Sequence, residues 1–228
     1  MLVLAIDTAL DSCAAAVLDT RTRQFLAQEA LPMKRGHAEA LMPLIARVMA
    51  QFGAGFEALD RIAVTTGPGS FTGLRVGISA ARGLALAAGK EVVGLTTLTA
   101  YAAPQVNEQH DTAILAAIDA RHDHVYYQVV TGNGSTLVNP TVAPIDETFD
   151  AARFGPLRIV GNAAQIIADR WPSQAEKPVL VDPQPAPDIT WVAWGGALAD
   201  PASALPKPFY LRAPDAKPKS EWATEPRS

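Results

Sequence analysis

Gly67-Pro68-Gly69-Ser70-Phe71-Thr72-Gly73-Leu74-Arg75 is the most specific stretch of this 228-residue sequence. It lies between a short apolar run and a helical pattern, and its glycines around Pro68 predict a tight turn from a strand into a helix. Ser70 or Thr72 can cap that helix by accepting a backbone N–H bond. The free N–H groups and positive dipole end at such a helix start can hold an anion. The stretch can equally be a turn and cap alone, and no Gly-Lys-Ser/Thr follows as in a nucleotide-binding P-loop.

The sequence on either side of this turn predicts alternating strands and helices. A continuous apolar run closed by Asp7 is typical of a strand buried on both faces. Between residues 37 and 52, apolar residues recur three and four positions apart, which predicts an amphipathic helix. The predicted strands of the first half are residues 2–6, 13–18, 24–30, 60–66 and 91–95, and the predicted helices are residues 37–52 and 72–88.

The second half repeats this order. An apolar run ends at Asp119 as the first one ends at Asp7, and Gly132-Asn133-Gly134 predicts a hairpin between the next two strands. The predicted elements are strands at 113–118, 125–131, 136–142 and 157–160 and a helix at 163–170. The repeat predicts an N-terminal lobe at residues 1–100, a C-terminal lobe at 101–212 and a flexible tail at 213–228, which has no hydrophobic periodicity.

Composition narrows the class of protein. Apolar residues make up 49% of the chain and the net charge is −4, which excludes wholesale disorder and gives no overall attraction to nucleic acid. Cys13 is the single cysteine, so we expect no internal disulfide and a reducing compartment. The first apolar run has no basic residue before it and meets Asp7 early, and no apolar run is long enough for a membrane span. We expect a soluble, cytoplasmic protein without a membrane segment.

These motifs resemble the TsaB (YeaZ) family. The resemblance rests on the nine residues quoted above, and it extends to segments spread over residues 1–130 and to one near the end of the chain. The further segments are Leu4-Ala5-Ile6-Asp7-Thr8-Ala9, His37-Ala38-Glu39 through Pro43, Ala80-Ala81-Arg82-Gly83-Leu84-Ala85-Leu86, Ala117-Ile118-Asp119-Ala120-Arg121, and Pro208-Phe209-Tyr210-Leu211-Arg212. The duplicated lobes then imply an α/β, two-lobed actin-like ATPase (ASKHA, ribonuclease H-like) fold with a mixed sheet in each lobe.

The resemblance implies a partner subunit and no catalysis of its own. A member of this family forms a heterodimer with TsaD, which transfers a threonylcarbamoyl group to the adenosine beside the anticodon of tRNA. TsaE joins the larger complex, tRNA is bound only through the complex, and the chain alone forms a homodimer. No cofactor is implied.

The metal site of TsaD is not expected here. That enzyme holds its metal with two histidines four residues apart on a helix, which places both rings on one face. In this sequence the stretch begins at His37, but the fifth position is Leu41. We interpret His37 as a surface or helix-start residue and predict no bound metal.

A nucleotide site is at most vestigial. Asp7 and Thr8 in the first hairpin, with Gly69 and Ser70 in the turn, could be remnants of a phosphate site. The first hairpin has no glycine, and Asp119-Ala120-Arg121 replaces the Asp-Gly-Gly expected in the second lobe. Asp7 can instead cap its own hairpin turn. A weak nucleotide-hydrolysing enzyme of the ASKHA class therefore remains the alternative to a scaffold subunit.

The helix at residues 72–88 is the predicted partner interface. Its polar residues form one narrow line, Arg75, Ser79 and Arg82, and a helix apolar on most sides must be buried on more than one. One side is expected against the lobe's own sheet and another against a partner helix, although burial between the two lobes would fit the pattern too. The predicted contact residues are Leu74, Arg75, Gly77, Ile78, Ala81, Arg82, Leu84 and Ala85, with Leu41 and Ile45 of the preceding helix.

Overall fold

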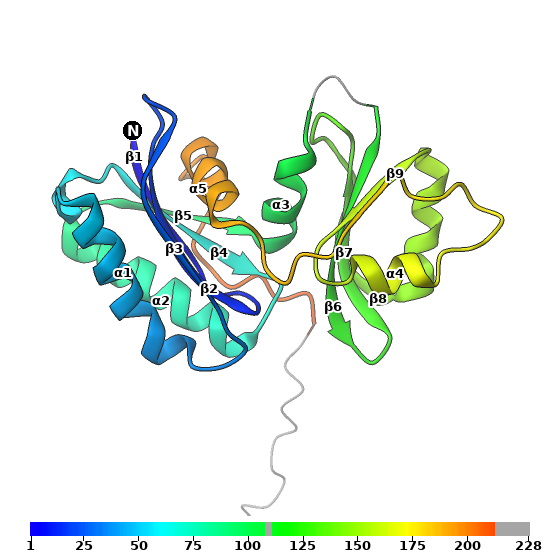
Figure 1. The fold of residues 1–228 in the computed structure, drawn as a ribbon, viewed down its shortest axis with the longest axis horizontal. Helices are drawn as coiled ribbons and strands as arrows, with labels where there is room; N and C mark the ends of the chain where they lie inside the picture. Colours follow the sequence, from blue (N-terminus) through cyan, green and yellow to red (C-terminus); the bar gives the residue numbers. More distant parts are fainter. Residues whose placement is uncertain (108–110, 213–228) are drawn as a thin grey trace, which may run out of the picture.

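The computed structural model describes residues 1–107 and 111–212, and it forms two lobes that are each built on a five-stranded sheet (Figure 1). The strand order is β3-β2-β1-β4-β5 in the first sheet and β8-β7-β6-β9-β10 in the second. In both sheets the first three strands of the lobe form an antiparallel meander, and the last two run parallel to the first. The predicted duplicated lobes with mixed sheets are thus confirmed, and the predicted tail at 213–228 lies outside the described residues.

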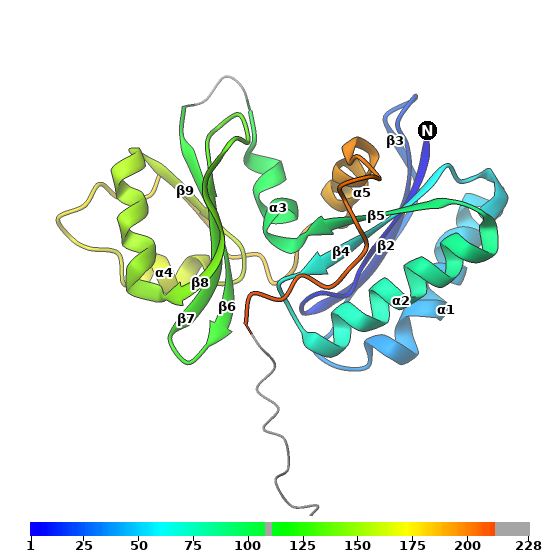
Figure 2. The ribbon, with the colours of Figure 1, turned by 180° about the vertical axis from the view of Figure 1, so that it is seen from behind.

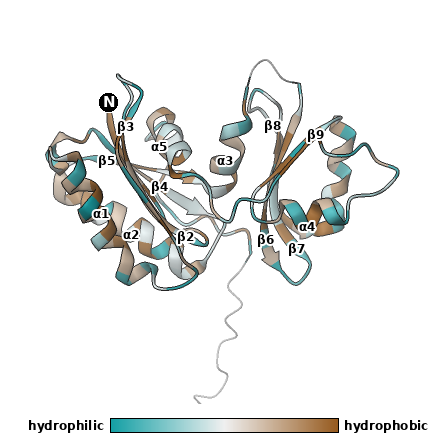
Figure 3. Ribbon diagram, viewed as in Figure 1, coloured by the Kyte–Doolittle hydropathy of each residue, from teal (hydrophilic) through white to brown (hydrophobic). Residues whose placement is uncertain are grey.

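The strands form close to where apolar runs predict them. In the first sheet they are β1 (Leu2–Asp7), β2 (Ser12–Asp19), β3 (Gln24–Pro32), β4 (Arg61–Gly67) and β5 (Glu91–Thr96). In the second they are β6 (Ala113–Arg121), β7 (His124–Val130), β8 (Thr136–Pro144), β9 (Leu157–Val160) and β10 (Leu180–Asp182). The central strands are buried along both faces, and Figure 3 shows hydrophobic colour along the strands of both sheets.

Helices cover both faces of the first sheet. On one face α1 (His37–Phe52) and α2 (Phe71–Ala88) lie side by side (Figure 2), and their apolar residues share a core with Leu4 and Ile6 of β1. Ser70 is the N-cap of α2, because its hydroxyl accepts the N–H of Gly73 at 3.2 Å. The second lobe contains η3 (Ile145–Phe154) and α4 (Ala164–Asp169), and α3 (Thr97–Ala102) connects the lobes.

The helix α5 (Ile189–Leu198) returns the chain to the first lobe. It packs on the free face of the first sheet, where β1 and β2 present the small side chains Ala5, Ala14 and Ala16. Gly196 lies so close to Ala63 of β4 that an added Cβ would overlap it. This helix lies within residues 101–212, the predicted second lobe, but packs on the sheet of the first lobe. It is absent from the prediction because its residues are almost all apolar and show no amphipathic period.

Arg61 holds the C-terminal end of α5. The side chain is buried, and its Nη1 donates to the carbonyl oxygens of Gly196 at 3.0 Å and Ala199 at 2.8 Å, while Nη2 contacts Glu91 at 3.2 Å. A cation placed at the last carbonyls of a helix satisfies groups that have no partner within the helix.

We expect Arg61→Met to lower the free energy of unfolding by about 2 kcal/mol, because the charged hydrogen bonds to α5 are lost. Urea unfolding followed by circular dichroism measures this value. Arg153→Met, which removes an arginine that stacks on Phe154 in the second lobe, is the control. Equal stability of Arg61→Met and wild type would show that α5 does not depend on this anchor.

No helix in the described part of the chain is both long and apolar enough to cross a membrane.

Candidate functional site

The first hairpin turn and the start of α2 are held together by hydrogen bonds and by close contact of their backbones. The hydroxyl of Thr8 donates to the carbonyl of Gly73 at 2.7 Å, and the N–H of Ser70 donates to the carbonyl of Ala9 at 2.7 Å. A Cβ on Gly69 would overlap the carbonyl of Ala9, and one on Gly73 would overlap the carbonyl of Thr8. The glycines of the motif are therefore needed for close approach of two backbones.

Asp7 is fully buried at the base of this contact. Its Oδ1 accepts the hydroxyl of Thr65 at 2.5 Å and the N–H of Ala9 at 3.1 Å, while Oδ2 has no hydrogen-bond partner among the described residues. Burial raises the pKa of Asp7, and the hydrogen bonds and the nearby His37 oppose this shift in part. Asp7 caps its own hairpin turn, as one of the two sequence interpretations has it.

The structure brings the four predicted vestigial phosphate-site residues together. Asp7 ends β1 and Thr8 follows it, and Gly69 and Ser70 precede α2 directly beside them. Their polar groups are nevertheless used within the chain: the Ser70 hydroxyl accepts the N–H of Gly73, and its own N–H bonds to the first hairpin. The geometry fits a structural lock, and a phosphate at this place would have to displace these bonds.

His37 is buried at the first residue of α1, which corrects the prediction of a surface residue. Its Nε2 lies 3.0 Å from the carbonyl oxygen of Leu10 in the first hairpin turn. The ring therefore ties α1 to the same turn that contacts α2. Its helix-start position agrees with the prediction.

The second hairpin turn repeats the Asp7 arrangement. The Oδ1 of Asp119 accepts the N–H of Arg121 at 2.7 Å, as Asp7 accepts the N–H of the residue two positions later. Arg121, His122 and Asp123 all have positive φ, a backbone region that costs free energy for residues other than glycine. Arg121 and His122 are exposed at the tip of this turn.

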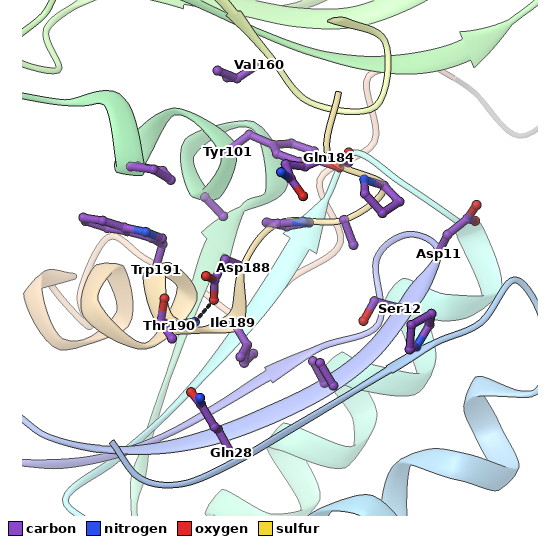
Figure 4. Close-up of a pocket in the computed structure, with 18 of the residues that line it drawn as sticks. Asp11, Ser12, Gln28, Tyr101, Val160, Gln184, Asp188, Ile189, Thr190 and Trp191 are labelled. Atoms are coloured by element: carbon purple, nitrogen blue, oxygen red, sulfur yellow. Dashed lines mark hydrogen bonds between the residues drawn. The ribbon is translucent and has the colours of Figure 1, made fainter. Parts of the chain in front are cut away.

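A cleft of about 640 Å³ lies where the two lobes meet. Figure 4 shows Ser12 and Gln28 of the first sheet on one side, with Tyr101 and Gln184 on the other. Four carboxylates belong to its lining: Asp11, Glu29, Asp182 and Asp188. Among the described residues that line the cleft, none is Lys, Arg or His, so the cleft is unfavourable for a polyphosphate.

The side of α2 that faces the sheet contains most of the predicted interface. The buried members of the predicted set are Leu74, Gly77, Ile78, Ala81 and Ala85 of α2 and Leu41 and Ile45 of α1. These seven residues belong to the core or contact it, so a partner cannot touch them in the folded chain. This corrects the predicted list, of which Arg75 and Arg82 are exposed and Leu84 is half-buried. The alternative prediction, that this helix is buried between the two lobes, is wrong, because α2 packs on β4 and beside α1.

The opposite side of α2, here called the outer face, is exposed. It comprises Arg75, Ser79, Arg82, Gly83 and Leu86, which recur at helical spacing. Leu86 is 86% exposed, and nothing lies within 4 Å of a Cβ built on Gly83. Met42 adds a 48% exposed side chain on the neighbouring α1. Leu86 and Met42 are missing from the prediction, although Leu86 follows Arg82 by one helical turn on the line already seen as polar.

The end of the described chain packs against the start of α2. The N–H of Phe209 donates to the carbonyl of Thr66 at 2.8 Å, and the Tyr210 ring stacks on Phe71 with centroids 5.5 Å apart. The guanidinium of Arg75 lies 3.8 Å from the Phe71 ring centre, and its Nε donates to the Tyr210 hydroxyl at 3.3 Å. The sequence singles out Pro208-Phe209-Tyr210-Leu211-Arg212, but it does not predict the contact of Tyr210 with Arg75, which lies 135 positions earlier in the chain.

We expect the stability of Asp7→Asn relative to wild type to rise with pH. A carboxyl group whose pKa is raised by folding stabilises the protein at low pH, and this stability is lost as pH rises through the folded-state pKa. Asn keeps an oxygen for Thr65 and Ala9 but never ionises. From about pH 4 upward, the difference in unfolding free energy should move towards the variant by up to ~1.4 kcal/mol per pH unit within the titration range.

Urea unfolding between about pH 4 and 8 measures this difference. Asp146→Asn, at an exposed carboxyl in η3, is the control. A difference for Asp7→Asn that stays constant with pH, or that moves towards wild type, would contradict the raised pKa.

Comparison with known proteins gives one family match and several relatives. The family model of TsaD, the tRNA N6-adenosine threonylcarbamoyltransferase, matches residues 26–171. The TsaB protein of Haemophilus influenzae, named for tRNA threonylcarbamoyladenosine biosynthesis, is 36% identical over 128 residues. That match covers 56% of this chain and 53% of the relative, so this chain matches about half of the relative's length.

Solved structures agree over more of the chain. YeaZ from Pseudomonas aeruginosa superposes with a TM-score of 0.74 and 28% identity, covering 92% of this chain and 99% of that one. The ROK hexokinase of Thermus thermophilus, at 17% identity and a TM-score of 0.50, covers 87% of this chain and 99% of that chain. The second likeness concerns the fold alone, and it agrees with the two-lobed actin-like class.

Proposed function

The chain belongs to the TsaB (YeaZ) family, and we propose that it is a non-catalytic subunit that binds and activates TsaD in the biosynthesis of threonylcarbamoyladenosine in tRNA. TsaD transfers the threonylcarbamoyl group to the adenosine beside the anticodon, and TsaE joins the larger complex. The single observation that carries the proposal is the closed contact between the first hairpin and α2 at the place where a nucleotide-binding relative would need open phosphate-binding groups.

The closed contact argues against catalysis by this chain. Thr8 and Ser70 have the residue types of a phosphate site, but their hydrogen-bonding groups are used by the lock between the hairpin and α2. An ATPase keeps such groups free to bind phosphate oxygens. The buried carboxyl of Asp7 is occupied on one oxygen by Thr65 and Ala9.

The charge of the interlobe cleft supports the same proposal. A nucleoside triphosphate between the lobes would meet Asp11, Glu29, Asp182 and Asp188. Glu29 pairs with Arg47 at 2.6 Å and Asp11 with Lys34 at 4.0 Å. Within the described part of the chain, Asp182 and Asp188 accept hydrogen bonds only from neutral donors, Gln184 Nε2 and the N–H of Thr190. Like charges in a cleft with few counter-charges weaken anion binding.

The part of the outer face around Gly83 and Leu86, towards the end of α2 and away from Arg75, supplies the proposed contact with TsaD. A stable protein interface needs exposed apolar anchors with few charges at its centre. Leu86 and Met42 are large exposed apolar side chains, and Gly83 lets another backbone approach closely. The TsaD family model matches residues 26–171 of this chain. In this proposal TsaD has helices corresponding to α1 and α2, and they pack against α1 and α2 of this chain. In the absence of TsaD, the same face would pair two copies of this chain.

The mechanism of activation in this proposal is conformational. The subunit binds one conformation of TsaD better than another, and this difference in binding free energy shifts TsaD towards its active state. Transfer chemistry and tRNA selection then belong to TsaD.

Reconstitution tests the assignment. Purified TsaD, TsaE and the enzyme that makes threonylcarbamoyl-adenylate are mixed with threonine, bicarbonate, ATP and tRNA, with or without this chain, and modified adenosine is quantified. We expect modification only when the chain is present, and unchanged modification with Asp7→Asn. Modification at the same rate without the chain would contradict the activator role.

Hydrolysis of ATP by the chain alone separates the scaffold from the weak nucleotidase. We expect phosphate release from Mg-ATP at the background rate for wild type and for Asp7→Asn alike. Turnover by wild type that Asp7→Asn abolishes would overturn the scaffold proposal and support the nucleotidase.

A further inference from the structure

Two exposed aromatic rings, two exposed arginines and the half-buried Arg212 follow one another from the start of α2 to the tip of the second hairpin. Arg75 contacts both Phe71 and Tyr210, and Arg212, two residues further on, places its Nη1 3.5 Å from the carbonyl of Ala120. The next residue is Arg121, which ends β6 at the turn into β7. Figures 1 and 2 both place the start of α2, the end of the described chain and this turn along the lower edge of the molecule. We call Phe71, Arg75, Tyr210, Arg212 and Arg121 the basic ridge.

The three arginines of the basic ridge have no carboxylate partner among the described residues. Other arginines of the chain do pair with carboxylates, including Arg47 with Glu29 at 2.6 Å and Arg170 with Asp123 at 2.7 Å. Asp119 and Asp123 flank Arg121 in the chain. Asp123 is engaged by Arg170, and Asp119 accepts the backbone N–H of Arg121. The ridge therefore carries a net positive charge on a chain whose overall charge is −4.

Tyr210 offers the ring that is most available for stacking, because Phe71 is already contacted by both Tyr210 and the guanidinium of Arg75. Phe71 is 41% exposed and Tyr210 is 43% exposed, and they lie stacked at 29° between planes. Aromatic faces next to arginines favour single-stranded nucleic acid, because bases stack on the rings and guanidinium groups contact phosphates. The interlobe cleft has the opposite charge and offers no such site.

We propose that the basic ridge binds a single-stranded stretch of RNA directly, as this chain's own contribution to holding tRNA. The stacked rings and the arginines without a carboxylate partner favour a single-stranded polyanion with bases. The choice of RNA over DNA rests on the proposed function, because TsaD acts on a tRNA loop in which bases are unpaired. This inference replaces the expectation that tRNA is bound only through the complex.

Fluorescence anisotropy with a labelled oligouridylate of about 12 nucleotides tests the ridge at about 20 and 150 mM salt. We expect saturable binding by wild type at low salt. Tyr210→Leu, which keeps an apolar contact with Phe71 but removes the stacking ring, should weaken binding about fivefold or more. Arg121→Asn should weaken binding and reduce the slope of log K against log salt by about 0.7, and Asn tolerates the left-handed backbone of that position.

Lys177→Gln is the matched control. It also removes one positive charge, but it lies exposed in the loop between α4 and β10, at the outer edge of the second lobe (Figure 1). Its affinity for the oligonucleotide should equal that of wild type. Thermal unfolding of each variant checks the fold.

The proposal that the basic ridge binds RNA would be contradicted if wild type did not bind at low salt. It would also be contradicted if Arg121→Asn and Lys177→Gln lost affinity equally. Equal affinity for an oligodeoxythymidylate would overturn the choice of RNA. Gel filtration with TsaD separates this inference from the proposed function. Normal TsaD binding without RNA binding refutes the ridge alone, and RNA binding without TsaD binding refutes the proposed subunit role alone.

Discussion

Replacing Gly73 with alanine should lower the free energy of unfolding by about 3 kcal/mol. A Cβ at this position overlaps the carbonyl oxygen of Thr8 and lies 3.3 Å from Cβ of Ser70. Neither neighbour can move freely, because the Thr8 hydroxyl bonds to the carbonyl of Gly73 and the Ser70 N–H bonds to Ala9. The added methyl group must therefore push α2 away from the first hairpin and disturb the core beneath it.

Gly83→Ala is the matched control in the same helix. Gly83 is exposed, and a Cβ built there has nothing within 4 Å. Because alanine favours the helix over glycine, this variant should be more stable than wild type by about 0.5–1 kcal/mol. Urea unfolding of both variants and wild type measures the two effects. Equal changes in the two variants would mean that the glycine of the motif is not required for close packing.

Gly83→Arg should weaken the binding of TsaD at least about 100-fold, which corresponds to about 2.7 kcal/mol. The position is open in the free chain, so the arginine fits without strain and improves helix propensity. On a surface that packs against another helix, the same side chain prevents close approach. The variant should thus be at least as stable as wild type and yet fail to bind.

Calorimetric titration with TsaD measures this loss. Gln165→Arg introduces the same residue at an exposed position of α4 in the second lobe and should bind as wild type does. Wild-type affinity of Gly83→Arg would show that TsaD contacts another surface. Gly77→Arg or Ala81→Arg cannot serve this purpose, because both positions are buried and the variants would fail to fold for internal reasons.

Most elements of the fold follow from patterns in the sequence. The strands of both meanders are continuous apolar runs ended by Asp or by turn residues, and the helices at residues 37–52 and 71–88 show three-and-four spacing with glycine at their ends. Two helices missing from the prediction have no such period. Helix α5 is apolar all round, and α3 is too short at six residues to show a stripe.

The candidate site is predictable in part. The residue types of the first hairpin and the turn before α2 identify the place where they meet. They do not indicate that glycines are there for backbone contact, because that depends on a neighbour about 65 residues away. A helix with apolar and small residues on most sides gives no orientation, so the sequence prediction places its buried side in the interface. Only the tertiary packing of α2 on β4 shows that Gly77 is buried and that Gly83 is exposed.

Gel filtration with light scattering on an equimolar mixture of this chain and TsaD from the same source tests the central claim most directly. The proposed subunit role predicts one species whose mass is the sum of one 24.1 kDa chain and one TsaD. Two separate species at every concentration, with both proteins folded, would contradict it.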